Sequence, residues 1–203
     1  NKLKVGFILL KKTKNFLMSN LFKKSLKEHT DLINGIHSLE NKIMMVSKKI
    51  YYLKKNNKKL FVCGNGGSAA DAQHFSAELV GRFEKDRNGF PAICLSNDSY
   101  AITAIGNDYG FNYVFSRQLE ALGSKDDILM SISTSGNSRN VIDAVKKADS
   151  MGLYNIALLG KDGGELKNMV DLPIIVASNR TARIQEMHIT LIHIICELIE
   201  AEL

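Results

Sequence analysis

The sequence lacks several features that would place it in a specialised class of protein. Its 203 residues include no Trp and only two Pro, and they contain no internal repeat or low-complexity tract. No stretch approaches the ~18 apolar residues that a membrane-spanning helix needs. The three cysteines, Cys63, Cys94 and Cys196, are far apart and odd in number, which argues against a disulfide scaffold or a zinc knuckle. We therefore expect an ordinary globular protein in a reducing, cytoplasmic setting.

The net charge of +6 is unevenly distributed along the chain. Residues 1–60 contain 15 Lys, no Arg and three acidic residues, a balance of +12, whereas the remaining residues carry a balance of −6. A Lys-rich arm can bind nucleic acid or a membrane surface. No stripe of basic residues interleaved with aromatic ones accompanies this charge. We therefore interpret the lysines as solvated helix faces, and we expect no nucleic acid and no membrane as partners.

The first 17 residues resemble a weak signal peptide but lack its defining parts. Their apolar run, VGFILL, has only six residues, two lysines follow it, and no small-residue cleavage site is present. Met18 then opens the segment MSNLFKKSL, as a start residue would. We expect residues 1–17 to be an extension outside the fold and residues 18–203 to form a single domain.

The order of apolar patterns predicts an α/β fold. Two segments with helical periodicity, 20–34 and 36–56, are separated by a break at Asn34–Gly35. Short apolar runs then alternate with helical segments, which is typical of a parallel, doubly wound sheet. The prediction is an αβα sandwich with N-terminal helices at 18–56 and an α/β core at 60–203. Its five strands are expected at 60–63, 92–95, 128–132, 155–159 and 172–176, and its helices at 68–83, 111–122, 138–151 and 181–202.

Two Gly- and Ser-rich loops join predicted strands to predicted helices. They are CGNGGS at residues 63–68 and STSGNS at residues 133–138. Free backbone N–H groups at a helix N-terminus bind phosphate, and ligands of doubly wound sheets bind at the carboxyl ends of the strands. Asn107–Asp108 and the start of the last helix are expected at the same edge. The sequence therefore predicts a crevice for a phosphorylated small molecule.

The two loops differ in how strongly they indicate phosphate binding. CGNGGS lacks the Gly-Lys-Ser/Thr ending of a Walker loop and the acidic partner of a dinucleotide fingerprint. It fits equally well a tight turn with Ser68 as the helix N-cap, and this alternative stays open. STSGNS offers four hydroxyls around one glycine, which favours phosphate binding over a plain polar loop with Ser138 as N-cap. The hydroxyls belong to Ser133, Thr134, Ser135 and Ser138.

Titratable residues follow the first loop on the predicted helix 68–83. His74 and Glu78 are four residues apart and therefore share a helix face. An imidazole and a carboxylate in that position suit proton transfer or metal binding. His188 and His193 lie on the last helix, where a lone histidine is more often a core residue than a catalyst.

Long, ordered motifs carry a family resemblance from about residue 20 to the C-terminus. The segments CGNGGSAADAQHFSAEL, IGNDYGFN, ISTSGNSRNV and TARIQEMH closely resemble the sugar isomerase (SIS) family, in its branch that acts on a heptose phosphate. The resemblance implies isomerisation of D-sedoheptulose 7-phosphate to D-glycero-D-manno-heptose 7-phosphate, the first step toward the ADP-heptose of lipopolysaccharide or capsule. It also implies a homotetramer with active sites at the subunit interfaces and one zinc per subunit.

The resemblance assigns roles only at positions that match the family motifs. It implies that Glu78 and His193 are the catalytic acid/base pair, acting through an enediol. It implies a zinc site of His74, Glu78, Gln185 and His193, although about 12 Å of helix rise separates the last two. Ala182 stands where some relatives carry Asp. The implied substrate-binding residues are Asn65, Gly66, Gly67, Ser68, Glu78, Asn107, Asp108, Ser133, Thr134, Ser135, Ser138 and Gln185.

Two other functions within the same family stay open at this point. One relative regulates chromosome replication by binding the initiator protein, and it lacks the second Gly of the Gly-Gly pair in CGNGGS, the catalytic Glu and the last-helix His. The presence of Gly67, Glu78 and His193 in this chain favours an enzyme. The second alternative is an isomerase or a sensor for another phosphosugar, because the sequence does not reveal which sugar length the pocket accepts.

Overall fold

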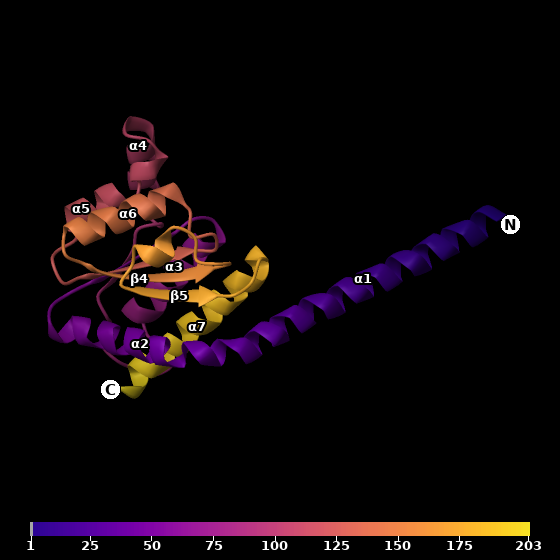
Figure 1. Cartoon of the computed structure of the whole chain (residues 1–203), viewed down its shortest axis with the longest axis horizontal. Helices are drawn as coiled ribbons and strands as arrows, with labels where there is room; N and C mark the ends of the chain where they lie inside the picture. Colours follow the sequence, from indigo (N-terminus) through magenta and orange to yellow (C-terminus); the bar gives the residue numbers. More distant parts are fainter. Residues whose placement is uncertain (1) are drawn as a thin grey trace.

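The computed structural model of the chain describes the backbone of residues 2–203 and the side chains of residues 16–203. Its centre is one sheet of five parallel strands in the order β2-β1-β3-β4-β5 (Figure 1). In the register of the sheet, Leu60 lies opposite both Ala92 and Ile128. The predicted parallel sheet is confirmed, with strand ends within one or two residues of those expected. The strands are β1 (Leu60–Gly64), β2 (Ala92–Cys94), β3 (Ile128–Ser133), β4 (Tyr154–Gly160) and β5 (Leu172–Val176).

Helices cover both faces of the sheet and form the predicted αβα sandwich (Figure 1). Successive residues of β1 point to opposite faces, so Leu60 and Val62 lie in one core while Phe61 and Cys63 lie in the other. The first core also contains α2 (Glu40–Lys55), α3 (Gly67–Val80) and α7 (Thr181–Ala201). The second contains α5 (Ser116–Leu122) and α6 (Arg139–Ser150). Because the strands are packed from both sides, the loops at their ends start from fixed positions.

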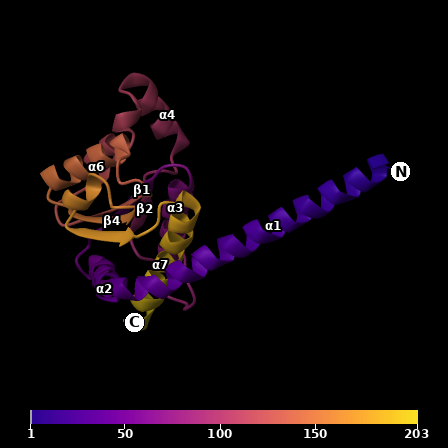
Figure 2. The same ribbon diagram turned by 45° about the vertical axis from the view of Figure 1, so that its right-hand side comes forward.

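The N-terminal helices lead into the first core. α1 (Lys2–Gly35) ends at the predicted break, and a 3-10 turn at Ile36–Leu39 joins it to α2. α1 extends away from the domain (Figures 1 and 2). The prediction that residues 1–17 are an extension falls mostly on side chains outside the described residues and stays a prediction; Phe16 and Leu17 are exposed. Among the described residues, none of the helices combines enough length with enough apolar character to cross a bilayer.

Three helices differ from the prediction. The predicted helix 68–83 ends at Val80, because the N–H groups of residues 83–85 donate to the Glu200 carboxylate instead of to helix carbonyls. The predicted helix 111–122 is interrupted, since a 3-10 turn at Phe111–Tyr113 precedes α5. An additional helix, α4 (Ser99–Asp108), is capped by Asp98, which accepts the N–H of Ala101 at 2.9 Å. α4 projects from the side of the domain opposite α2 (Figure 1).

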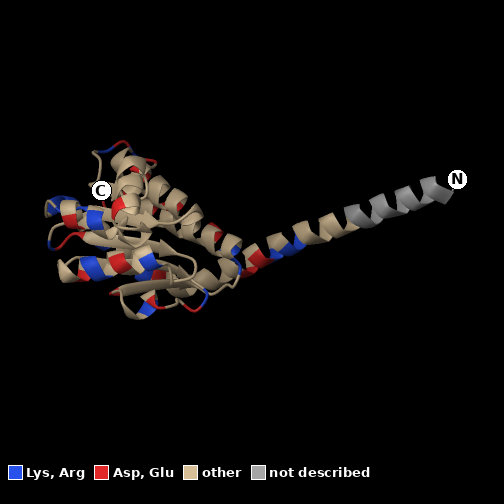
Figure 3. Ribbon diagram, turned by 90° about the horizontal axis from the view of Figure 1, so that it is seen from above, with Lys and Arg blue, Asp and Glu red and all other residues tan. Residues whose placement is uncertain are grey.

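Charged side chains of both signs are mixed over the surface. Figure 3 shows Lys and Arg interspersed with Asp and Glu on the visible face of the domain and on the described part of α1. Some of these side chains pair along a helix, as Lys27 does with Asp31 at 2.7 Å. The interpretation of the N-terminal lysines as solvated helix faces stays a prediction, because part of that segment lies outside the described side chains.

Candidate active site

The candidate site lies at the carboxyl edge of the sheet. All five strands end at this edge because they are parallel. α3 follows β1 and α7 follows β5, so both helices begin at this edge and run back along the same face of the sheet, side by side (Figure 2). Side chains on the border between α3 and α7 can therefore meet the loops at one end and one another farther along.

The loop after β3, called the hydroxyl cup below, brings the hydroxyls of Ser133 and Ser138 together. Gly136 has φ +66°, and a Cβ at this position would lie 2.0 Å from the carbonyl oxygen of Gly163, so the loop requires glycine. The Gly136 N–H donates to Ser133 Oγ at 3.1 Å, and Ser133 Oγ lies 3.3 Å from Ser138 Oγ. Ser138 is at the N-cap position of α6, but its side chain makes no capping hydrogen bond. The alternative of a plain N-cap therefore lacks the hydrogen bond that defines it.

The loop after β1 brings the backbone close to α7. Gly66, with φ +56°, is the N-cap residue of α3, so the alternative that Ser68 caps this helix is wrong. A Cβ on Gly67 would lie 2.3 Å from Nε2 of Gln185. A side chain at position 67 would therefore displace the Gln185 amide from its place beside this loop. The structure thus brings together two of the predicted substrate-binding residues, Gly67 and Gln185.

The first loop is held in place by two polar residues that were not predicted from the sequence, Asn140 and Ser96. Asn65 and Asn140 exchange two side-chain amide hydrogen bonds of 2.8 Å each, which tie the first loop to the start of α6. Ser96 Oγ accepts the Gly64 N–H at 3.1 Å and donates to the Gly64 carbonyl at 2.8 Å. The sequence signal for Asn140 is a polar residue on the otherwise apolar, buried face of α6.

His74, Glu78 and His193 meet on the border between α3 and α7. Nε2 of His74 lies 3.0 Å from Oε1 of Glu78 and 3.2 Å from Nε2 of His193. The rings of His74 and His193 are 5.1 Å apart between centroids. The His74 side chain is 44% exposed and that of Glu78 is 26% exposed, so a ligand can reach the cluster. An imidazole beside a carboxylate in such a position can accept and donate protons.

Burial shifts the pKa values of two nearby groups. The pKa of Asp71, one turn before His74, is raised to about 6, because burial opposes ionisation more strongly than His74 favours it. His188 is fully buried, and burial lowers its pKa to about 4. Its Nε2 lies 3.0 Å from the carbonyl oxygen of Leu159. His188 is therefore a neutral core residue at pH 7, as expected by default for a histidine on an apolar helix.

Asn107 and Asp108 lie at the end of α4, and both are exposed. Asn107 Nδ2 donates to Asp108 Oδ1 at 2.8 Å. Among the described residues, neither side chain makes a hydrogen bond or ion pair with the two loops. The single subunit therefore does not join these two residues to the rest of the site, and their role stays a prediction.

Comparison with known proteins places these features in a family. Residues 26–160 match the SIS domain family. The chain is 49% identical over 187 residues to the phosphoheptose isomerase of Aliarcobacter butzleri, a match that spans 92% of this chain and 99% of the relative. It is 52% identical over 188 residues to the phosphoheptose isomerase of Campylobacter concisus, spanning 91% and 97%. This chain belongs to the phosphoheptose isomerase family.

Solved structures of phosphoheptose isomerases share the whole fold. That of the Neisseria gonorrhoeae protein has a TM-score of 0.86 at 42% identity and matches 91% of this chain and 99% of its own. The Francisella tularensis protein has a TM-score of 0.83 at 39% identity, with 91% and 96% matched. These matches confirm the SIS fold and the assignment of an enzyme, an aldose–ketose isomerase, over the regulatory alternative.

The donor atoms that the phosphoheptose isomerase resemblance assigns to zinc fit this metal in kind. Two imidazole nitrogens and a carboxylate oxygen are common zinc ligands, and ligand atoms on a tetrahedral zinc lie about 3.3 Å apart. The separations of 3.0 and 3.2 Å around His74 Nε2 are close to this value. Among side chains 16–203, however, no group of three or more His, Cys, Asp or Glu already surrounds a metal position. Gln185 lies at Gly67, so the four-ligand site stays a prediction.

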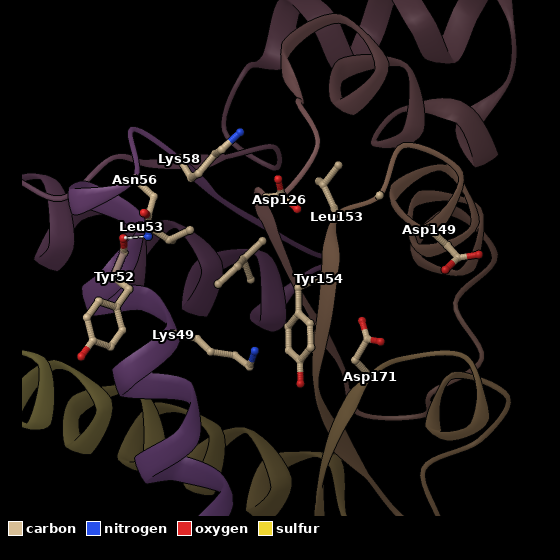
Figure 4. Close-up of a pocket in the computed structure, with 12 residues that line it drawn as sticks. Lys49, Tyr52, Leu53, Asn56, Lys58, Asp126, Asp149, Leu153, Tyr154 and Asp171 are labelled. Atoms are coloured by element: carbon tan, nitrogen blue, oxygen red, sulfur yellow. Dashed lines mark hydrogen bonds between the residues drawn. The ribbon is translucent and has the colours of Figure 1, made fainter.

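A separate cavity of about 790 Å³ opens at the opposite edge of the sheet (Figure 4). It lies between the end of α2 and the starts of β3, β4 and β5, where Lys49 Nζ sits 3.7 Å from the centroid of the Tyr154 ring. None of the predicted phosphoheptose isomerase site residues lines this cavity. We therefore assign the candidate site to the carboxyl edge.

Proposed function

We propose that the chain isomerises D-sedoheptulose 7-phosphate to D-glycero-D-manno-heptose 7-phosphate, the reaction that begins ADP-heptose biosynthesis. The cluster of His74, Glu78 and His193 carries the proposal, because it lies on α3, which begins at the first candidate loop, and on α7, which begins at the same edge of the sheet. The names of the relatives support the heptose phosphate as substrate. All three cysteines are unpaired, which supports a reducing, cytoplasmic location.

The hydroxyl cup is the proposed phosphate site. Its hydroxyls and the backbone N–H groups at the start of α6 are neutral donors, and the positive end of the helix favours an anion without a Lys or Arg. The first loop and Gln185 then face the sugar. The proposed phosphate ligands are Ser133, Thr134, Ser135 and Ser138, with Ser68, and the proposed sugar ligands are Asn65, Gly66, Gly67, Asn107, Asp108 and Gln185.

Glu78 and His193 are the proposed acid/base pair. Moving the carbonyl from C2 to C1 requires removal of a proton from C1 and delivery of a proton to C2, with an enediol between the two steps. The Glu78 carboxylate removes the C1 proton and delivers a proton to C2 on the same face of the sugar, and the proton that it carries exchanges with water between the two transfers. His193 moves a proton between the two oxygens. General acid/base groups contribute typically about 10²–10⁴-fold each.

Zinc is the proposed cofactor, held by His74, Glu78, Gln185 and His193. When bound, zinc would polarise the substrate carbonyl as a Lewis acid. Zinc content by elemental analysis, together with the melting temperature of the metal-stripped protein after zinc addition, tests the ligand set without an activity assay. His74→Ala should lower the zinc content, whereas His37→Ala, an exposed histidine outside the cluster, should not. Equal zinc content in both variants would contradict the proposed ligand set.

A homotetramer with active sites at subunit interfaces completes the proposal. Contiguous exposed apolar side chains commonly mark protein–protein contacts, and α1 exposes several of them in the single chain. Light scattering should give about four times the subunit mass of 22.5 kDa. The exposed apolar residues are Phe16, Leu17, Met18, Leu21, Phe22 and Leu26.

Turnover of the purified protein with the heptose phosphate tests the proposed base. Glu78→Gln keeps the shape of the side chain and removes its basicity, so kcat should fall by about 10²–10⁴-fold. Glu120→Gln, an exposed carboxylate on α5, is the matched control and should keep the wild-type rate. A Glu78→Gln variant with the wild-type kcat would exclude Glu78 as the base.

A further inference from the structure

A buried carboxylate links the far ends of α3 and α7. Glu200, near the end of α7, is only 2% exposed. Its Oε1 accepts the Phe83 N–H at 3.1 Å and Arg87 Nε at 2.8 Å, and its Oε2 accepts the N–H groups of Glu84 at 3.0 Å and Lys85 at 2.8 Å. Burial alone would raise the pKa of Glu200, but these hydrogen bonds hold it near 2. Glu200 is therefore an ionised carboxylate with four donors directed at it.

Arg87, which donates to the Glu200 carboxylate, also donates hydrogen bonds to carbonyls at the carboxyl end of α3. Its Nη2 donates to the Glu78 carbonyl at 2.8 Å, and its Nη1 donates to the carbonyls of Leu79 at 2.9 Å and Gly81 at 3.3 Å. The last carbonyls of a helix have no partner within the helix, and a cation there is favoured by the helix dipole. Arg87 thus holds the backbone of Glu78, the residue proposed as the base.

The segment that Glu200 holds also carries an aromatic ring to His193. The N–H of Phe83 is bound by Glu200, and the Phe83 ring packs against the His193 ring with centroids 5.6 Å apart and planes at 33°. His193 therefore contacts two rings from the α3 side, those of His74 and Phe83. The position of Phe83 depends on the Glu200 carboxylate, since the end of α3 lies before it.

We propose that Glu200 and Arg87 are positioning residues for the acid/base pair. They act on Glu78 through the carbonyls of α3 and on His193 through Phe83, and their hydrogen bonds among the described residues do not include the two candidate loops. The pair depends on such a link because its two members lie on different helices. This inference rests on the proposed isomerase function, in which a misplacement of about 1 Å can cost about 10²-fold in rate.

The test compares Glu200→Gln and Arg87→Lys with a matched buried carboxylate. Asp127 is fully buried and accepts the N–H groups of Lys59 and Ser124 at 2.8 Å each, but it lies at the opposite edge of the sheet. We expect kcat to fall by about 10- to 100-fold in Glu200→Gln and in Arg87→Lys. KM should change less than about two-fold, because neither substitution alters the hydroxyl cup. Asp127→Asn should lose stability but keep the wild-type kcat.

Two results would overturn the proposal. One is a folded Glu200→Gln variant with the wild-type kcat, and the other is an equal loss of kcat in Asp127→Asn. If Glu200→Gln does not fold, Phe83→Leu replaces it, since this change keeps the backbone N–H that Glu200 binds and removes only the ring. Phe83→Leu should lower kcat without raising KM, and an unchanged kcat would count against the proposal.

Crystal structures of the variants keep this inference separate from the proposed reaction. In Glu200→Gln, the contact between His74 Nε2 and His193 Nε2 should be broken, whereas Asp127→Asn should retain the 3.2 Å separation. An unchanged contact in Glu200→Gln would refute the positioning role, whether or not the wild-type protein turns over a heptose phosphate. If Glu200→Gln loses this contact but the wild-type protein does not turn over a heptose phosphate, the positioning role stands and only the proposed reaction is refuted.

Discussion

Glu200 should make the folded chain sensitive to acid. The hydrogen bonds to its carboxylate lower its pKa from an ordinary value of 4.5 to about 2, against the opposing effect of burial. Between these values the unfolded chain binds a proton that the folded chain does not, so stability falls as pH falls. The difference between 4.5 and 2 corresponds to about 3 kcal/mol of unfolding free energy. This contribution is complete above pH 4.5 and is lost as the pH approaches 2.

Urea unfolding followed by circular dichroism measures this effect in wild type and Glu200→Gln. The two proteins share every other titrating group, so the difference between their unfolding free energies isolates Glu200. Protein concentration is kept the same, because assembly stabilises the folded state by mass action. The advantage of wild type over the variant should shrink by about 3 kcal/mol between pH 7 and pH 2. If the unfolding free energies of wild type and Glu200→Gln differ by the same amount at every pH in this range, the Glu200 carboxylate does not cause the sensitivity to acid.

Three further substitutions test single contacts. Gly136→Ala places a Cβ 2.0 Å from the Gly163 carbonyl oxygen at φ +66°, so it should cost at least about 1–3 kcal/mol of stability. An unchanged melting temperature would show that the hydroxyl cup does not require glycine at this position. Gly67→Ala should displace the Gln185 amide, which lies 2.3 Å from the new Cβ, and raise KM; a wild-type KM would separate Gln185 from substrate binding. Burial lowers the pKa of His188 to about 4, so between pH 6.5 and 4 the unfolding free energy of wild type should fall relative to that of His188→Leu, which keeps every other titrating group, Asp71 included. Equal pH dependence in urea unfolding would show that His188 is not buried and neutral.

The sheet is predictable from the sequence because its strands are buried on both faces and form continuous apolar runs. The stretch Ile128–Ser133 is fully buried, for example, and it ends directly in the STSGNS loop. α4 is harder to predict, because none of its residues is buried and Asp98 is its only clear local signal. The end of α3 at Val80 depends on Glu200, which is far along the chain. Local patterns therefore give the elements, but contacts distant in sequence set some of their ends.

The residue types of the site are also visible in the sequence, whereas their contacts are not. Helix geometry alone separates Gln185 from His193 by about 12 Å along α7. The structure shows where each meets α3: Gln185 at Gly67, and His193 at His74. The pairing of Asn65 with Asn140 joins the first loop to the start of α6, and no local pattern in the sequence relates these two segments.

Proton transfer in heavy water gives a direct test of whether Glu78 isomerises the heptose phosphate through an enediol. Purified wild-type protein is incubated with sedoheptulose 7-phosphate in D₂O, with and without added zinc, and the sugars are followed by NMR. We expect D-glycero-D-manno-heptose 7-phosphate with deuterium at C2, formed at a rate that Glu78→Gln lowers by about 10²–10⁴-fold. No aldose product under either condition, or an undiminished rate in Glu78→Gln, would contradict this mechanism.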